Sequence, residues 1–338
     1  MLFTILIIKS AFANTNDTII SGTCGEYLNY SIKSNELLIF GMGDMSNYSS
    51  NKPPWYQYLH TLKSINITFG VTSIGAFAFY NAINVNSISI PKTLIKIGDE
   101  AFSNCYNLQN FSIPKKVKYI NSRTFYECKS LQSVTIDGNV VSIHQGAFEK
   151  CSNLITLVIP HSVTFIGYCA FSECSSLQNI IIPENVKAIN GKTFNKCESL
   201  KIIAFLGSIQ SIGSMAFQNC IKLSKIKIPQ NITSLSQYCF KSCYELDEII
   251  LPDSLVSIEN GCFANCINLK SIIIPEKVTF IDAFAFAYCN NLRSITIPEG
   301  VTEIYGWTFF HCYSLYSIVF KGNITKIGNQ CFTECMKL

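Results

Sequence analysis

Cysteine is the residue type in this chain with the widest chemical scope, because thiolates bind zinc, act as nucleophiles and oxidise to disulfides. The 338 residues include 16 cysteines, and eleven of them recur at a constant interval of 23 residues from Cys105 to Cys335. A metal site or a catalytic nucleophile needs only one local cluster. A constant interval over eleven positions therefore indicates a structural repeat.

These eleven residues, called the cysteine column below, have two interpretations. Neighbouring members lie about one strand spacing apart, within the Cα separation of a disulfide, yet stacked side chains point in parallel and bridge poorly. Ala82 and Leu59 occupy the same position in earlier repeats. We therefore predict buried free thiols that act as small apolar side chains.

Five cysteines lie outside the column, at Cys24, Cys169, Cys239, Cys262 and Cys331. Cys239 and Cys262 occupy equivalent positions in adjacent repeats, so a disulfide between them remains an alternative. The C-x3-C spacing that they form with the column matches no strong zinc pattern, and no histidine pair completes one.

Other residues with catalytic potential are scattered along the chain. The four histidines fall at different positions of different repeats, at His60, His144, His161 and His311. Gly41-Met42-Gly43 lacks the third glycine of a dinucleotide-binding fingerprint, and no D-x-D-x-D calcium loop occurs. We predict no catalytic residue, no metal site and no cofactor, and so a protein that is not an enzyme.

The cysteine column belongs to a longer sequence unit. The consensus is C-x2-L-x2-I-x-I-P-x2-V-x2-I-G-x2-A-F-x2-C, with phenylalanine three residues before the cysteine and leucine three residues after it. Twelve complete units run from Leu59 to Glu334, and a thirteenth has four residues. The repeat stops inside a coil at Leu338, which indicates either a truncated product or an end that a partner covers.

Each unit has the pattern of one coil. Ile180 and Ile182 alternate inward with the period of a strand, and Pro183 ends the strand because it has no backbone donor. Val163 and Ile166 of another unit exemplify a second pair of inward positions. The A-F-x2-C segment then closes the coil with a helical or irregular turn.

A single coil cannot bury its own apolar positions, so neighbouring coils must stack. The sequence predicts an α/β-type repeat solenoid, mostly β, with a parallel sheet on one face and about twelve coils, roughly 55–60 Å long. Its core explains why 48% of the residues are hydrophobic and only 14% charged. The net charge of +4 gives no strongly basic face for nucleic acid. Outside the amino terminus no run approaches the ~18 apolar residues of a spanning helix, so we expect no transmembrane anchor in this chain.

The unit resembles the leucine-rich repeat of the BspA-like (Treponema pallidum type) surface-protein family, over residues 59–338. Residues 20–58 resemble the amino-terminal cap segment of such proteins, through residues 21–25, 37–45 and 53–56. The resemblance implies a secreted or cell-surface protein that binds protein ligands, such as host matrix or cell-surface proteins. The alternative is a structural or scaffold protein that uses the solenoid for homotypic or intracellular assembly.

The cellular compartment that we expect is inferred from the amino-terminal sequence. A short apolar run from Leu2 to Ile8 and the small residues Ala11 and Ala13 are typical of a secretory signal peptide over residues 1–13. The alternative is an apolar first strand of the cap. We expect the cap segment over residues 14–58 and the solenoid over residues 59–338. Seven N-x-[ST] sequons suit a glycosylated exterior, at Asn16, Asn29, Asn47, Asn66, Asn110, Asn231 and Asn323.

Binding is expected where the repeats differ from one another. The outward position of the strand changes from polar to apolar along the chain, and the apolar candidates are Val158, Ile181, Ile250 and Ile273. The alternative is that these side chains only favour the strand. A second candidate set consists of aromatic residues on the turns, at Phe77, Tyr168, Tyr238, Phe284, Tyr305 and Trp307. Some of these rings would then simply cover the edges of the coils.

Overall fold

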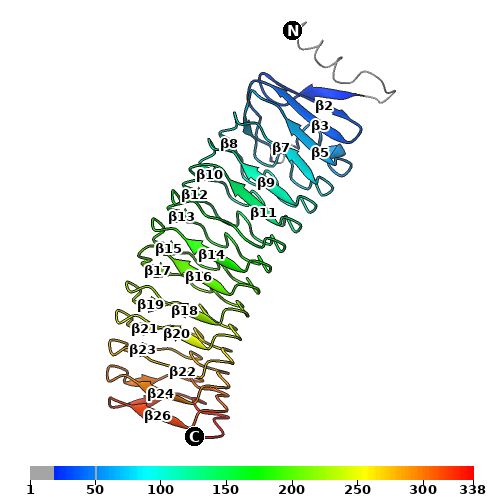
Figure 1. Cartoon of the computed structure of the whole chain (residues 1–338). Helices are drawn as coiled ribbons and strands as arrows, with labels where there is room; N and C mark the ends of the chain where they lie inside the picture. Colours follow the sequence, from blue (N-terminus) through cyan, green and yellow to red (C-terminus); the bar gives the residue numbers. More distant parts are fainter. Residues whose placement is uncertain (1–18, 50–51) are drawn as a thin grey trace.

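The computed structural model describes residues 19–49 and 52–338, and the predicted signal peptide lies outside these residues. They form an elongated, gently curved stack of similar coils (Figure 1). Equivalent residues of adjacent coils pair at an offset of 23, as at Asn110 and Ser133. The described residues contain one short 3-10 helix, η1 (Tyr56–Tyr58), so the predicted mostly-β leucine-rich repeat solenoid is confirmed.

Most coils contribute two short strands, which stack in two rows. The first strand row comprises β5 (Ser64–Ile67), β7 (Ser87–Ser89), β9 (Asn110–Ile113), β11 (Ser133–Ile136), β14 (Asn179–Ile182), β16 (Ile202–Phe205), β18 (Lys225–Lys227), β20 (Glu248–Ile250), β22 (Ser271–Ile272), β24 (Ser294–Ile297) and β26 (Ser317–Phe320). The second strand row comprises β4 (Gly43–Asp44), β6 (Val71–Ile74), β8 (Lys96–Ile97), β10 (Tyr119–Ile120), β12 (Ser142–Ile143), β13 (Phe165–Ile166), β15 (Ala188–Ile189), β17 (Ser211–Ile212), β19 (Ser234–Leu235), β21 (Ser257–Ile258), β23 (Phe280–Ile281), β25 (Glu303–Ile304) and β27 (Lys326–Ile327). The second row also pairs in parallel, which the repeat pattern did not predict.

The first strand row is interrupted at several points. In the described part of the chain, β7 has no ladder to β9, β16 has none to β18, and β20 has none to β22. The coil between β11 and β14 contributes only the single residue Thr156, which bridges Ser133 and Asn179. Hollows open on the surface at three of these places, as described below.

The third side of each coil is a series of tight turns, not a helix. Phe77 and Asn81, two residues before and two after Phe79, have left-handed φ values of 57° and 64°. The N–H groups of Phe77, Phe79 and Asn81 donate to carbonyl oxygens of the next coil at 2.9–3.0 Å. The same φ values and hydrogen bonds recur along the stack. Of the two predicted alternatives for this segment, a helical or an irregular turn, the irregular turn is therefore correct.

The amino-terminal cap is an antiparallel meander. It comprises β1 (Ile20–Thr23), β2 (Leu28–Lys33) and β3 (Glu36–Gly41), and β3 pairs in parallel with β5 of the first coil. The cap therefore extends the first strand row and covers its end. Trp55 is fully buried beneath it, and its indole Nε1–H donates to the carbonyl oxygen of Ala78 at 2.8 Å.

The core is a ladder of stacked phenylalanine rings. Twelve phenylalanines, from Phe79 to Phe332, lie one per coil with successive ring centroids 5.3–5.7 Å apart and interplanar angles of 2–20°. Trp55 continues the ladder into the cap, with its ring 5.8 Å from that of Phe79. Rings within the stack therefore pack against the rings of the coils before and after them, so the hydrophobic core is continuous from coil to coil.

The cysteine column lies beside the ladder as free thiols. Each Sγ–H donates to the carbonyl oxygen of the phenylalanine in the preceding coil, at 3.0–3.4 Å. All 16 cysteines are free, so the alternative disulfide between Cys239 and Cys262 is not formed. Burial raises the pKa of the Cys105 and Cys289 thiols to about 12, which keeps them protonated and poorly nucleophilic near neutral pH.

Truncation of one ring in the ladder should destabilise the whole stack. Phe194→Ala removes a fully buried ring between two others, and we expect a loss of about 3–5 kcal/mol in the free energy of unfolding. The matched control is Phe165→Ala, because the Phe165 side chain is 48% exposed on β13 and should change stability by about 0.5 kcal/mol or less. Urea unfolding followed by circular dichroism measures both. Equal losses for the two variants would show that the ladder has no special role.

Thiol accessibility gives a second test. Because burial raises their pKa, the column thiols carry little thiolate at pH 8, and iodoacetamide should modify them slowly in the native protein. Cys335 is half-buried while the other fifteen are buried, so it should react first. In urea the pKa values return towards about 8.5, and all sixteen should react. Rapid native labelling of several column cysteines, located by peptide mass spectrometry, would contradict this packing.

Candidate protein-binding surfaces

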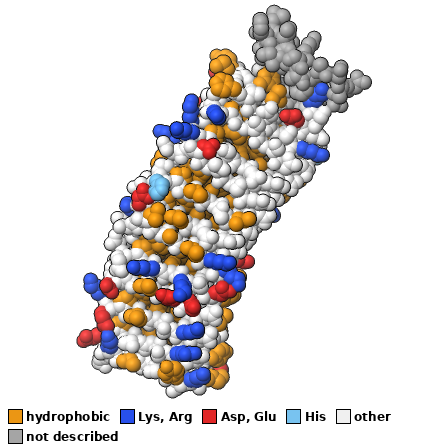
Figure 2. All heavy atoms as spheres, in the orientation of Figure 1, with side chains coloured by type: hydrophobic (Ala, Val, Ile, Leu, Met, Phe, Trp, Pro, Cys, Tyr) orange, Lys and Arg blue, Asp and Glu red, His pale blue; other side chains and the backbone are white. Residues whose placement is uncertain are grey.

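The outward position of the first strand row exposes all four predicted apolar side chains. Val158 is 83% exposed and Ile273 is 87% exposed, while Ile181 and Ile250 are about half exposed. Figure 2 shows a band of hydrophobic side chains along the middle of the visible face. These residues are thus available to a partner, although they do not all belong to one patch.

Three further exposed apolar residues lie on the same three consecutive coils as two of the predicted ones. Ile155, Ile202 and Leu206 are 44%, 60% and 54% exposed. Together with Val158 and Ile181 they form what we call the central apolar patch. A shallow groove of about 280 Å³, lined in part by Val158, Ile181 and Leu206, lies within it.

We did not predict these three residues from the sequence, because we considered only one of the outward positions in each repeat. Leu206 stands where most repeats have proline, and this deviation was the available signal. Its N–H donates to the carbonyl oxygen of Ile182 at 3.0 Å, a bond that proline could not make. The next residue, Gly207, approaches the backbone of Glu184 so closely that a Cβ there would lie 2.2 Å from its carbonyl oxygen.

Ile250 and Ile273 lie farther along the row. Ile250 is the last residue of β20 and Ile273 directly follows β22, two strands that have no ladder between them in the described chain, and Lys227 on β18 separates both residues from the central apolar patch. They therefore form a second, smaller apolar site.

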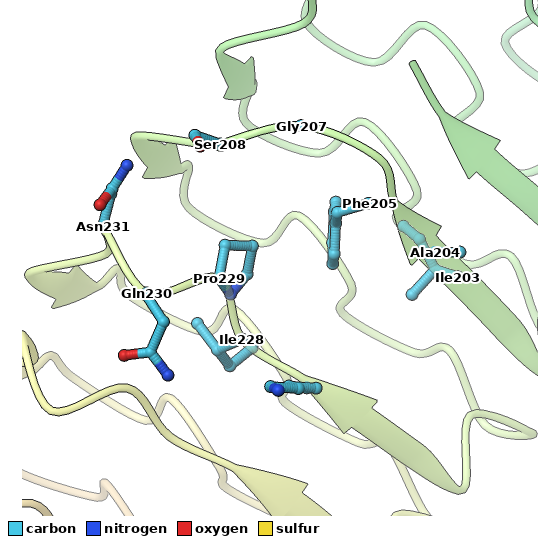
Figure 3. Close-up of a pocket in the computed structure, with 10 residues that line it drawn as sticks. Ile203, Ala204, Phe205, Gly207, Ser208, Ile228, Pro229, Gln230 and Asn231 are labelled. Carbon is cyan, nitrogen blue, oxygen red and sulfur yellow. The ribbon is translucent and has the colours of Figure 1, made fainter. Parts of the chain in front are cut away.

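Another hollow lies where β16 and β18 separate. Figure 3 shows Phe205 of β16 facing Ile228 and Pro229 of the next coil, with Asn231 at the rim. The hollow has a volume of about 450 Å³. It adds a depression to the surface near the central apolar patch.

The turn aromatics do not form a single patch. Phe284 and Trp307 stack with centroids 5.1 Å apart, whereas Tyr305 contacts Phe280. Tyr238 lies over Gly261, where a Cβ would come within 2.4 Å of the ring. Some of these rings thus cover neighbouring coils, and Tyr168 and Phe77 lie on separate coils.

Charged side chains pair between equivalent positions of adjacent coils. Lys225 and Glu248 approach to 2.7 Å, and Lys150 and Glu127 to 2.8 Å. The hydrogen bond from Lys150 lowers the pKa of the Glu127 carboxyl. Exposed pairs of this kind add little stability, so they mainly determine the charge pattern of the surface.

Four of the sequons have exposed asparagines, at Asn47, Asn110, Asn231 and Asn323. Asn29 and Asn66 are half-buried, and the hydroxyl group of Ser31, in the first of these sequons, is buried without a partner. Asn16 lies outside the described residues.

The described residues offer no arrangement typical of a catalytic site. His161 pairs with Glu184 at 2.9 Å on the surface, and His311 contacts the hydroxyl of Tyr313 while Cys312 donates into the core. Across residues 19–49 and 52–338, no group of three or more His, Cys, Asp or Glu side chains is placed to hold a metal ion. In the same part of the chain, no helix has the length and apolar character needed to cross a bilayer.

The fold is shared with several solved structures. A leucine-rich repeat protein from Eubacterium ventriosum is 20% identical, with a TM-score of 0.59 over 94% of this chain and 95% of that chain. A leucine rich cell surface protein from Faecalibacterium prausnitzii is 24% identical, with a TM-score of 0.51 over 91% and 96%. The pneumococcal vaccine antigen PcpA is 19% identical, with a TM-score of 0.56 over 91% and 88%.

Sequence comparison identifies the repeat itself. A comparison with curated proteins gives no match. The family described as "BspA type Leucine rich repeat region (6 copies)" matches residues 54–178, 164–289 and 256–338, which is most of the chain and includes all of the predicted solenoid. The chain therefore belongs to the BspA-type leucine-rich repeat family.

Proposed function

We propose that this chain is a non-enzymatic, secreted or cell-surface protein that binds protein partners, such as host matrix or cell-surface proteins. The observation that carries the proposal is the central apolar patch. Val158, Ile181 and Leu206 expose large apolar side chains around a groove on the first strand row. Contiguous exposed apolar area of this kind marks interaction surfaces in soluble proteins.

The residues at the outward strand position of other coils argue against a purely structural role for Val158 and Ile181. Ser112 and Thr135 fill the outward position of β9 and β11, and those strands pair over four residues. The coil that contains Val158 pairs with its two neighbours only through isolated bridges at Thr156, despite the strand preference of the Val158 side chain. Apolar side chains are thus neither required for pairing nor sufficient for it.

The shape of the side chains also suits binding. Val158, Ile181 and Ile202 are β-branched, so they lose little rotamer freedom when a partner covers them. The groove beside Leu206 would accept one apolar side chain of a partner. The stacked pair of Phe284 and Trp307 is a second contact site on the turns.

The relatives support the compartment part of the proposal. The Faecalibacterium protein is described as a cell surface protein and the pneumococcal protein as a vaccine antigen. The signal-like residues 1–13 and the four exposed sequons of this chain agree with export.

Polar replacement within the central apolar patch should weaken binding to host targets. Val158→Thr with Ile181→Thr keeps the β-branched shape but removes apolar contact area. We expect at least about tenfold weaker binding of the labelled protein to cultured epithelial cells and to immobilised matrix proteins. The matched control is Tyr119→Ser with Phe165→Ser, which removes two half-exposed rings from the second strand row.

Unchanged binding by the Val158/Ile181 variant, with an unchanged unfolding midpoint, would rule out this surface. A selective loss in a Tyr238→Ala and Trp307→Ala variant would assign binding to the turn aromatics instead. Absence of binding to any cell or matrix target, combined with self-association of the wild type, would favour the alternative of a homotypic scaffold.

Export can be tested separately by expressing the full chain in insect cells. We expect secretion, an amino terminus at Asn14 and a mass decrease on N-glycan removal. A matched chain that starts at Asn14 should stay inside the cell without glycans. Retention of the full chain in the cytosol, unglycosylated, would contradict a secreted or surface protein.

A further inference from the structure

A second surface feature lies near the cap, where β7 and β9 separate. A hollow of about 560 Å³ opens between their coils. Its apolar lining includes Ile88, Ile90 and Pro114, and three lysines border it, Lys92, Lys115 and Lys116. We call these three residues the lysine cluster.

The geometry of the coils concentrates the positive charge. Lys92 and Lys115 occupy equivalent positions of adjacent coils and both line the hollow. Lys116 follows directly, and Lys96 and Lys118 follow a few residues later in the same two coils. All five side chains are exposed.

Few nearby groups neutralise this charge. Within the described residues none of these five lysines makes a salt bridge, whereas Lys150, Lys225 and others pair with glutamates of adjacent coils. Among the residues that the structure describes, Asp137 is the one carboxylate that lines the hollow, and the Ser112 hydroxyl donates to it at 3.0 Å. A cluster of like charges without counter-charges attracts a polyanion.

The basic character is local and is not a property of the repeat. The position of Lys92 and Lys115 carries Gly138 in the next coil and the paired His161 and Glu184 beyond it. Farther along it is acidic, at Asp253, Glu276 and Glu299. Figure 2 shows basic side chains gathered beside the hydrophobic band towards the amino-terminal end of the visible face.

We propose that the lysine cluster binds a sulfated polysaccharide. Ammonium groups act as compact point charges that donate hydrogen bonds to sulfate oxygens from many directions. In the described part of the chain no arginine lines the hollow, and arginine is the residue whose planar fork recognises carboxylates in two-point contacts. The apolar lining of Ile88, Ile90 and Pro114 offers a surface for the C–H face of a sugar ring.

This site is independent of the proposed protein-binding surface. The two share no residue, and the two hollows lie in different coils. Loss of one should leave the other intact, so the two proposals can fail separately.

The test measures binding of a heparin oligosaccharide to the full chain by isothermal titration calorimetry at low salt. The variant is Lys92→Gln, Lys115→Gln and Lys116→Gln. Its matched control is Lys201→Gln, Lys270→Gln and Lys277→Gln, which removes the same charge from three exposed lysines on other coils. We expect the first variant to lose at least about tenfold in affinity and to show a weaker salt dependence, and the control to bind almost as the wild type does.

Two further probes separate the ligand classes. Desulfated heparin keeps its carboxylates, and poly-glutamate presents carboxylates on a peptide, so both should bind much more weakly than heparin. Equal affinity for either probe would overturn the assignment to sulfate and would indicate an acidic partner in general. Equal losses in the two triple variants would overturn the site, since net charge alone would then explain binding.

Discussion

A coil of 23 residues cannot complete its own core, and the rest of the structure depends on this constraint. The Phe194 ring has no packing surface above and below it unless two neighbouring coils are present. The Cys197 thiol likewise finds its acceptor, the carbonyl oxygen of Phe171, only in the coil before it. Burial of the core and the thiol hydrogen bonds therefore both depend on contacts between neighbouring coils, and each coil stabilises the next. At the amino-terminal end the cap completes the series, because Trp55 supplies both an aromatic surface for Phe79 and a donor for the Ala78 carbonyl.

The turns on the third side carry backbone strain that these inter-coil bonds offset. Left-handed φ values cost energy for residues with a Cβ, yet Phe284 and Trp307 adopt them, at 59° each. The N–H groups of these two residues donate to the next coil at 3.0–3.3 Å, so the conformation is fixed by bonds that the side chain does not influence. Side chains as different as those of Glu100, Lys192 and Trp307 are then accepted at this position of the turn. The fold thus separates a uniform interior from a variable exterior, and function can change without loss of the core.

Much of the interior could be predicted from the sequence because it repeats. The solenoid, its phenylalanine ladder and the buried thiols follow from slots that recur every 23 residues. The thiol hydrogen bonds could not be predicted, since spacing reveals burial but not the direction of Sγ. The left-handed turns had a weak signal, in Gly146 and Gly261 at one turn position and asparagines such as Asn81 at the other. The interruptions of the first strand row were not predicted, because the spacing of inward residues does not determine how closely two coils approach.

Those interruptions link the two candidate surfaces. The groove of the central apolar patch lies where Thr156 forms only isolated bridges to its two neighbours, and the lysine cluster lies where β7 and β9 separate. In both places the sequence also departs from its repeat, with Leu206 at the proline position and lysines at a position that becomes acidic later. A continuous ladder presents a closely packed row of side chains and leaves no hollow. Separation of two coils exposes the flanks of their inward residues, such as Ile88 and Ile90, and creates a concave site that a regular solenoid lacks. Irregularity in the stacking is therefore the physical origin of the two hollows that we propose as binding sites.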